Sequence, residues 1–147
     1  MGDYRGRKIP EGVSYDLGYH VWAKVEGGLV SVGATDPAQQ YAGEIIHLGI
    51  KKVGTRLERG AILATIESAK YMGPMRSPVT GTVAEVNAEV SKKPSLVNRD
   101  AYLNWVARVT PEKLDEDMAA LTPGPAALDK YKPIIDEWEI EASGKTG

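Results

Sequence analysis

The chain has 147 residues, a formal net charge of −2 and no cysteine. This length suits one domain with its own core. The net charge argues against nucleic acid as the main partner, because there is no excess of basic residues to contact phosphates. The absence of cysteine excludes disulfides and cysteine nucleophiles. The polar N-terminus lacks the apolar segment of a signal peptide and no apolar run reaches membrane length, so we expect a soluble, cytoplasmic protein without a membrane partner.

A hairpin and a short helix are the first predicted elements. Residues 21–32 alternate apolar and polar side chains on both sides of a glycine pair, which is typical of two strands joined by a tight turn. Thr35 or Asp36 can then cap a helix in which Pro37 takes the first position. This helix is expected to end near Gly43, a place where positive φ is common.

The middle of the chain repeats a scheme of strand, glycine turn and strand. Residues 44–50, 53–70 and 71–87 follow this scheme, with a turn expected at Thr80-Gly81. The rhythm predicts an all-β sandwich or flattened barrel. A proline-containing loop then leads to a last strand at about residues 105–109.

A helix is predicted after the last strand, over about residues 110–121. Thr110 can cap a helix with Pro111 at its first position, and one face of that helix is apolar: Leu114, Met118 and Leu121. Residues 122–130 contain several helix breakers and are interpreted as a linker. The remainder carries apolar side chains that can dock on the domain, and the last five residues are expected to be loose.

The side chains offer little catalytic chemistry. His20 and His47 are flanked by apolar or aromatic residues, and we expect them to pack in or near strands rather than bind a metal. Ser68 and Ser77 lack the glycine context of a nucleophile elbow. A carrier or binding module is therefore favoured over an enzyme.

Lys70 is the residue with the most distinctive setting. No other charged residue lies between Glu67 and Arg76, and the pattern places Lys70 at the tip between two strands. A tip exposes the amine to partner enzymes, and a lysine amine can form a stable amide at the end of a long stem. The alternative is an ordinary solvated surface lysine.

The residues around Lys70 match a known motif. Residues 67–71 read Glu-Ser-Ala-Lys-Tyr and residues 77–81 read Ser-Pro-Val-Thr-Gly, with further matches in the stretches HVWAKVEGG, VGATDPAQQYAGEI and PSLVNRDAY. Over about residues 15–122 the chain resembles the lipoyl carriers, and more closely the H protein of the glycine cleavage system. The resemblance implies a mostly β lipoyl domain, a barrel-sandwich hybrid of short antiparallel strands with an inserted helix and a C-terminal helix.

The resemblance also implies the site and its partners. Lipoate is expected as an amide on Lys70, with Glu67 recognised by the lipoate-attaching enzyme. The enzymes that would act on the lipoyl arm are either those of glycine cleavage or a heterodisulfide-reductase-like complex. Dihydrolipoamide dehydrogenase is a further possible partner. The dithiolane of lipoate would supply redox chemistry to a chain without cysteine. The implied organisation is an N-terminal segment (1–14), a lipoyl domain (15–122) and a C-terminal extension (123–147). Biotin carriers have a methionine on each side of the modified lysine. Residues 69–71 read Ala-Lys-Tyr, so they do not match the biotin pattern.

The chain departs from the glycine cleavage pattern near the lysine. Tyr71, Met72 and Met75 make this region more apolar, Gly73 is expected to start a turn with positive φ, and Arg76 is expected to reverse the local charge. These changes resemble lipoate-binding proteins of bacterial sulfur oxidation, so the favoured cargo is a sulfur intermediate. The alternatives are an aminomethyl carrier of glycine cleavage and an unmodified interaction domain.

Overall fold

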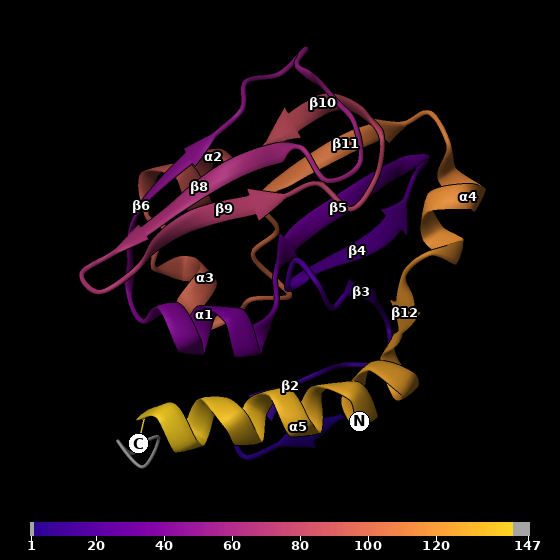
Figure 1. Ribbon diagram of the computed structural model, residues 1–147. Coiled ribbons are helices and arrows are strands. Elements are labelled where there is room, and N and C mark those ends of the chain that lie inside the picture. Colours follow the sequence, from indigo (N-terminus) through magenta and orange to yellow (C-terminus); the bar gives the residue numbers. More distant parts are fainter. Residues whose placement is uncertain (1, 143–147) are drawn as a thin grey trace.

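The strands of the protein form a seven-stranded sheet, a three-stranded sheet and an N-terminal hairpin (Figure 1). The computed structural model describes residues 2–142. The seven-stranded sheet has the order β12-β3-β4-β5-β11-β10-β7, the smaller sheet has the order β6-β8-β9, and the pairs of strands are antiparallel. The strands are β1 (Asp3–Tyr4), β2 (Arg7–Lys8), β3 (Ser14–Asp16), β4 (Val21–Glu26), β5 (Leu29–Ala34), β6 (Ile45–Ile50), β7 (Arg56–Leu57), β8 (Ile62–Ser68), β9 (Met72–Arg76), β10 (Gly81–Val86), β11 (Ala107–Pro111) and β12 (Thr122–Pro123). The predicted mostly β lipoyl-type fold with an inserted helix and a C-terminal helix is confirmed.

Five helices complete the described part of the chain. They are α1 (Asp36–Ala42), α2 (Ala88–Lys92), α3 (Leu96–Arg99), α4 (Leu114–Ala119) and α5 (Gly124–Ala142). None of the helices in residues 2–142 is both long enough and apolar enough to cross a membrane. The last five residues, expected to be loose, lie outside the described residues.

The local signals of the first predicted elements are confirmed. Gly27 and Gly28 have φ of 58° and 80° and join β4 to β5, which is the backbone that a two-residue hairpin turn needs. The Thr35 hydroxyl accepts a hydrogen bond from the backbone N–H of Ala38 at 3.2 Å and so caps α1. The helix ends at Gly43, whose φ is 83°.

Gly33 on β5 leaves the space that the buried indole of Trp22 on β4 occupies. A Cβ at Gly33 would lie 2.5 Å from the indole nitrogen, and Trp22 is only 1% exposed, with its N–H donated to the carbonyl of Ala101 at 3.0 Å. Gly33→Ala is therefore expected to lower the free energy of unfolding by about 1–3 kcal/mol, because an overpacked core must shift.

Urea denaturation checks this prediction. Gly12→Ala is the matched control, because nothing lies within 4 Å of a Cβ added there. Equal stability of the Gly33 and Gly12 variants would contradict the close packing of β4 and β5 around the indole.

The predicted start of the helix after β11 is wrong. Thr110 and Pro111 pair with Thr82 and Gly81 in the β10–β11 ladder, so the strand continues through both residues. The helix α4 begins at Leu114, and Lys113 precedes it without a side-chain cap. The loop expected before this strand also contains two helices, α2 and α3; the carboxamide of Asn87 caps α2 by accepting from Glu89 and Val90.

The predicted linker is also wrong, because its first two residues form β12 and the rest form the first turns of α5. Gly124 begins the helix and Pro125 follows it, where a proline is tolerated since the first N–H groups of a helix have no intrahelical partner. Helix α5 lies beside the β1–β2 hairpin, below α1 in Figure 1. A second buried cluster joins these segments to the large sheet: Ile9, Tyr15, Trp22, Ala127, Tyr131 and Ile135.

Candidate functional site

Lys70 occupies a tight turn between β8 and β9. The backbone N–H of Ser68 donates to the carbonyl of Tyr71 at 2.8 Å and closes the turn, while Lys70 itself is exposed. The buried hydroxyl of Ser68 donates to the carbonyl of Ala42 at 2.6 Å, so the turn is tied to the end of α1. The fold thus holds the backbone around a free, solvent-accessible amine.

The stem of Lys70 lies against Gly43. A Cβ added at Gly43 would come within 3.1 Å of Lys70 Cε. The glycine therefore serves two purposes, since it ends α1 with a positive φ and also leaves room for the lysine side chain.

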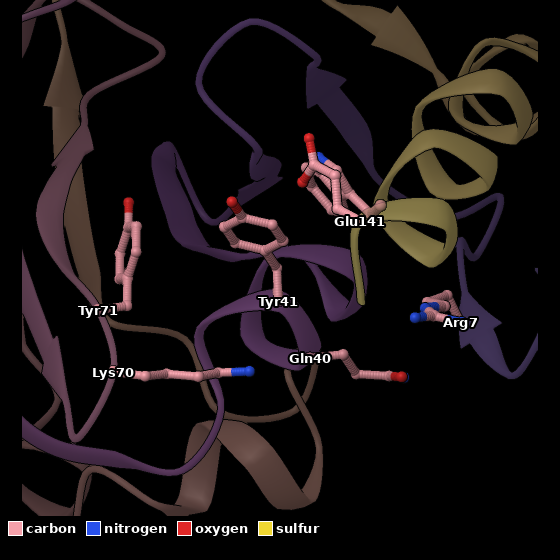
Figure 2. A pocket seen from close by; sticks show the side chains of 7 residues that line it. Arg7, Gln40, Tyr41, Lys70, Tyr71 and Glu141 are labelled. Atoms are coloured by element: carbon pink, nitrogen blue, oxygen red, sulfur yellow. The ribbon is translucent and has the colours of Figure 1, made fainter. Parts of the chain in front are cut away.

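Lys70 borders a cleft of about 310 Å³. Its walls come from four separate segments: Arg7 on β2, Gln40 and Tyr41 on α1, Tyr71 after the lysine, and Trp138 and Glu141 on α5. In Figure 2 the Lys70 side chain extends toward Gln40, and Tyr41 lies between Tyr71 and Glu141. The amine therefore borders a space large enough for a small organic group.

A more apolar chamber of about 230 Å³ adjoins this cleft. Tyr41, Tyr71 and Trp138 line both spaces, with ring centroids 4.6 Å apart for Tyr41 and Trp138 and 6.2 Å apart for Tyr41 and Tyr71. The chamber is completed by apolar side chains and by His20. Aromatic side chains thus form the shared boundary between a more polar cleft and a more apolar chamber.

His20 occupies a constrained position in the chamber wall. Its φ is 57°, its Nδ1 lies 3.0 Å from the hydroxyl of Tyr131, and its ring centroid is 5.1 Å from that of Trp138. Burial lowers the pKa of His20 below its ordinary value, and the nearby charge of Asp16 offsets part of this effect. The imidazole is therefore held neutral at pH 7.

This lowered pKa predicts that acid destabilises the fold through His20. The unfolded histidine binds a proton below its ordinary pKa of about 6.5, whereas the folded one resists protonation, so this stability is present above that pH and is lost as pH falls toward the folded pKa. Between pH 7.5 and 5.5 the wild type should lose more stability than His20→Asn. Asparagine is the matched variant because it tolerates positive φ and does not titrate. Parallel stability profiles from denaturation at each pH would contradict this role of His20.

Glu67 lies away from the cleft. In β8 it is half-buried and stands opposite His47 on β6 and Met72 on β9, and it is not among the residues that line either space. Met72 is 67% exposed and the neighbouring Ile46 is 58% exposed. The turn that carries Lys70 therefore has a second surface, formed by the small sheet and accessible to a partner.

Two expectations about the residues after Lys70 are wrong. Arg76 pairs with Ile62 at the opposite end of the β8–β9 ladder and donates to the carbonyl of Gly60 at 2.9 Å, so it does not reverse the charge near the lysine. Gly73 is an ordinary residue of β9 without positive φ. The Tyr71 hydroxyl covers it and occupies the space that a Cβ would need.

The sequence motif gave no signal for most of the cleft. Arg7, Tyr41, Trp138 and Glu141 come from segments that are distant from the lysine in the chain, and only the packing of α5 and β2 brings them together. Within residues 2–142, no group of three or more histidine, aspartate and glutamate side chains is placed to hold a metal ion.

Comparison with known proteins decides the family. The model of the Glycine cleavage H-protein family matches residues 14–133. The chain belongs to this family. Helix α5 continues past the matched residues, so Trp138 and Glu141 lie outside the match.

Individual H proteins resemble the chain over most of its length. Glycine cleavage system H protein 3 of Aquifex aeolicus is 38% identical over 94% of this chain and 89% of its own length. A probable glycine cleavage system H protein 2 of Sulfolobus acidocaldarius is 43% identical over 87% of this chain and 88% of its own. The crystal structure of an H protein from Mycobacterium marinum, 28% identical, superposes with a TM-score of 0.66 and covers 70% of this chain and 86% of the other.

These comparisons confirm that the chain is an H-protein-like member of the lipoyl carriers. They favour the glycine cleavage alternative over the sulfur-oxidation interpretation, because all three H proteins above bear glycine cleavage names.

Proposed function

We propose that the protein is a carrier without catalytic activity of its own, bearing lipoate as an amide on Lys70 Nζ. The observation that supports this most strongly is the exposed lysine in a turn closed by Ser68 and Tyr71 and tied to α1. A modifying enzyme needs an accessible amine on a fixed backbone, and this turn provides one beside an open cleft. A lipoate-attaching enzyme is the partner that this step requires.

The surroundings of Lys70 fit an acylated lysine. Gly43 leaves room beneath the stem, and Tyr41, Tyr71 and Trp138 offer an apolar surface to an alkyl chain. When bound, lipoate supplies a two-electron disulfide couple. The residues of this chain bind and orient the arm and shield one side of it from water.

The cargo that we propose first is the aminomethyl group of glycine cleavage. Support comes from the family match over residues 14–133 and from the glycine cleavage names of the relatives. The partners are then the glycine cleavage enzymes, together with dihydrolipoamide dehydrogenase for reoxidation of the arm, and the proposed location is the cytoplasm.

A sulfur intermediate, exchanged with a heterodisulfide-reductase-like complex, is the second candidate cargo. Two observations favour it: the exposed Met72 beside the lysine turn and the similarity of the chain to three differently numbered H proteins of one organism, Aquifex aeolicus. Several such carriers in one cell suggest that some of them serve other enzymes.

Replacement of an authentic H protein in a reconstituted glycine cleavage system tests the cargo. The lipoylated chain is expected to support glycine decarboxylation within about tenfold of the authentic carrier, which corresponds to a barrier difference of about 1.4 kcal/mol. Release of labelled carbon dioxide from glycine is the measurement. A fully lipoylated chain that supports no decarboxylation would reject the aminomethyl cargo and leave the sulfur candidate.

We also propose that Glu67 contributes to recognition by the lipoate-attaching enzyme. Its position on the sheet surface next to the turn, between His47 and Met72, supports this role. Glu67→Gln is expected to slow lipoylation several-fold without loss of stability, because it removes a charge that the enzyme can bind.

Initial rates of adduct formation, followed by intact mass, check this role of Glu67. Glu26→Gln, at the β4–β5 turn, is the matched control, since it removes an exposed strand charge elsewhere. Equal rates for the two variants would show that Glu67 is an ordinary solvated charge.

A further inference from the structure

A polar trough of about 480 Å³ lies between α1 and α3. After α1 it is lined by Gly43, and on the α3 side by four polar residues: Lys93, Ser95, Asn98 and Arg99. The same glycine lies against the stem of Lys70, since a Cβ added there would come within 3.1 Å of Lys70 Cε. A protein that engages Lys70 is therefore within reach of the trough.

The carboxamide of Asn98 holds the α3 side of the trough in place. Its Nδ2 donates to Gln39 Oε1 at 2.8 Å and to the carbonyl of Gly43 at 2.9 Å, and its Oδ1 accepts from the backbone N–H of Ile45 at 2.8 Å. These bonds join α3 to the end of α1 and to the start of β6. Little ordering is then needed when a ligand binds, which favours affinity.

The cations of the trough lack carboxylate partners. Of the seven arginines in the chain, Arg76 donates to a carbonyl and five form ion pairs: Arg5, Arg7, Arg56, Arg59 and Arg108. Within residues 2–142 no ion pair involves the exposed Arg99 or Lys93. The Ser95 hydroxyl does not cap α3. Glu44 is the only carboxylate among the described residues that line the trough, so the trough is positive.

The positive charge extends over this side of the molecule. Helix α2 packs against β6 and α3 packs against α1, and the four elements lie on one side in Figure 1. Residues 44–55 and 88–99, which include β6 and both of the later helices, contain five lysines or arginines and two glutamates, a net charge of +3. Since the whole chain has a net charge of −2, the other residues together carry −5. An acidic protein surface is thus attracted to this side and repelled by the remainder.

We propose that the trough between α1 and α3 is a docking site for an acidic segment of an enzyme that acts on the lipoylated arm of Lys70. The guanidinium of Arg99 binds a carboxylate through two parallel hydrogen bonds, while Lys93 supplies a second cation and Ser95 a hydroxyl donor. Attraction to the positive side orients the carrier before contact. This inference rests on the proposed function, and it names the charge of the partner and the place where the partner binds.

The test uses the full chain without lipoate and a blocked peptide, acetyl-tetraglutamate amide, as the probe. The backbone amide resonance of Gly43 is followed at low salt during the titration. The expected result is a saturable shift with tetraglutamate, and less than about one-third of that shift with blocked tetralysine or with inorganic phosphate at equal ionic strength. Added salt should suppress the shift, because exposed charges are screened.

Arg99→Gln is expected to weaken tetraglutamate binding about fivefold or more, since it removes a charge-assisted contact. Arg99→Lys should restore part of the loss, because the ammonium keeps the charge but not the bidentate geometry. Lys24→Gln is the matched control and should leave binding unchanged, as Lys24 is an exposed cation on β4 that does not line the trough.

Three results would overturn the proposal: no saturable shift with tetraglutamate, an equal response to phosphate, or equal losses in Arg99→Gln and Lys24→Gln. Because the chain in this experiment carries no lipoate, these results are independent of whether Lys70 is modified in the native protein. Failure of the docking site and failure of the proposed function are thus distinguishable.

Discussion

Replacement of Lys70 by arginine is expected to abolish lipoate attachment completely while leaving the fold intact. The guanidinium of arginine stays protonated and is not acylated, and the exposed side chain contributes little to the core. The free energy of unfolding should therefore change by less than about 0.5 kcal/mol. Intact mass after incubation with a lipoate-attaching enzyme, together with a denaturation curve, measures both effects.

Lys93→Arg is the matched control for this experiment. Lys93 is another exposed lysine and follows α2, so its replacement should leave the adduct in place. A lipoyl adduct that persists in Lys70→Arg would place the attachment site elsewhere and remove the basis of the proposed function.

Tyr131→Ala is expected to cause the largest loss of stability, about 3–5 kcal/mol, because it empties the space of a fully buried aromatic ring. Tyr131 is 0% exposed, and its hydroxyl lies 3.1 Å from Thr35 Oγ1 and 3.0 Å from His20 Nδ1. The side chain thus joins α5 to the start of α1 and to the chamber wall. Denaturation in guanidinium chloride is the measurement.

Tyr131→Phe separates the ring from its hydroxyl. This variant keeps the packing and is expected to cost about 1–3 kcal/mol, since it leaves the buried Thr35 hydroxyl with one partner fewer. A loss below about 1 kcal/mol for Tyr131→Ala would show that α5 is held to the domain by other contacts.

The parts of the fold that the sequence predicted correctly are those with strong local signals. The glycine pair at residues 27–28 requires positive φ, and Thr35 with Pro37 is a typical helix start. The same reasoning applies to the turn at Lys70, where alternating residues on both sides lead into a short connection. In each case the neighbouring residues alone determine the backbone.

The errors come from places where packing or pairing overrides a local signal. Pro111 has a good context for a helix start, but pairing of β11 with β10 extends the strand through it. The proline–glycine stretch at residues 122–125 has the composition of a helix breaker, but a proline in the first turn of a helix costs little. Arg76 lies far from Lys70 because it stands at the other end of β9.

The candidate site was predictable at the lysine and not at the cleft. The motif around Lys70 is contiguous, whereas Arg7, Tyr41 and Glu141 meet only because α5 and the β1–β2 hairpin fold back over α1 (Figures 1 and 2). Glu141 in particular carries no motif.

The most direct test of the central claim is the intact mass of this protein purified from its native source, followed by fragmentation to locate any adduct. A carrier with lipoyl-Lys70 predicts the mass of the polypeptide plus one lipoyl group in amide linkage, with the increment on the fragment that contains Lys70. A mass equal to that of the bare polypeptide, or an adduct confined to another residue, would contradict it.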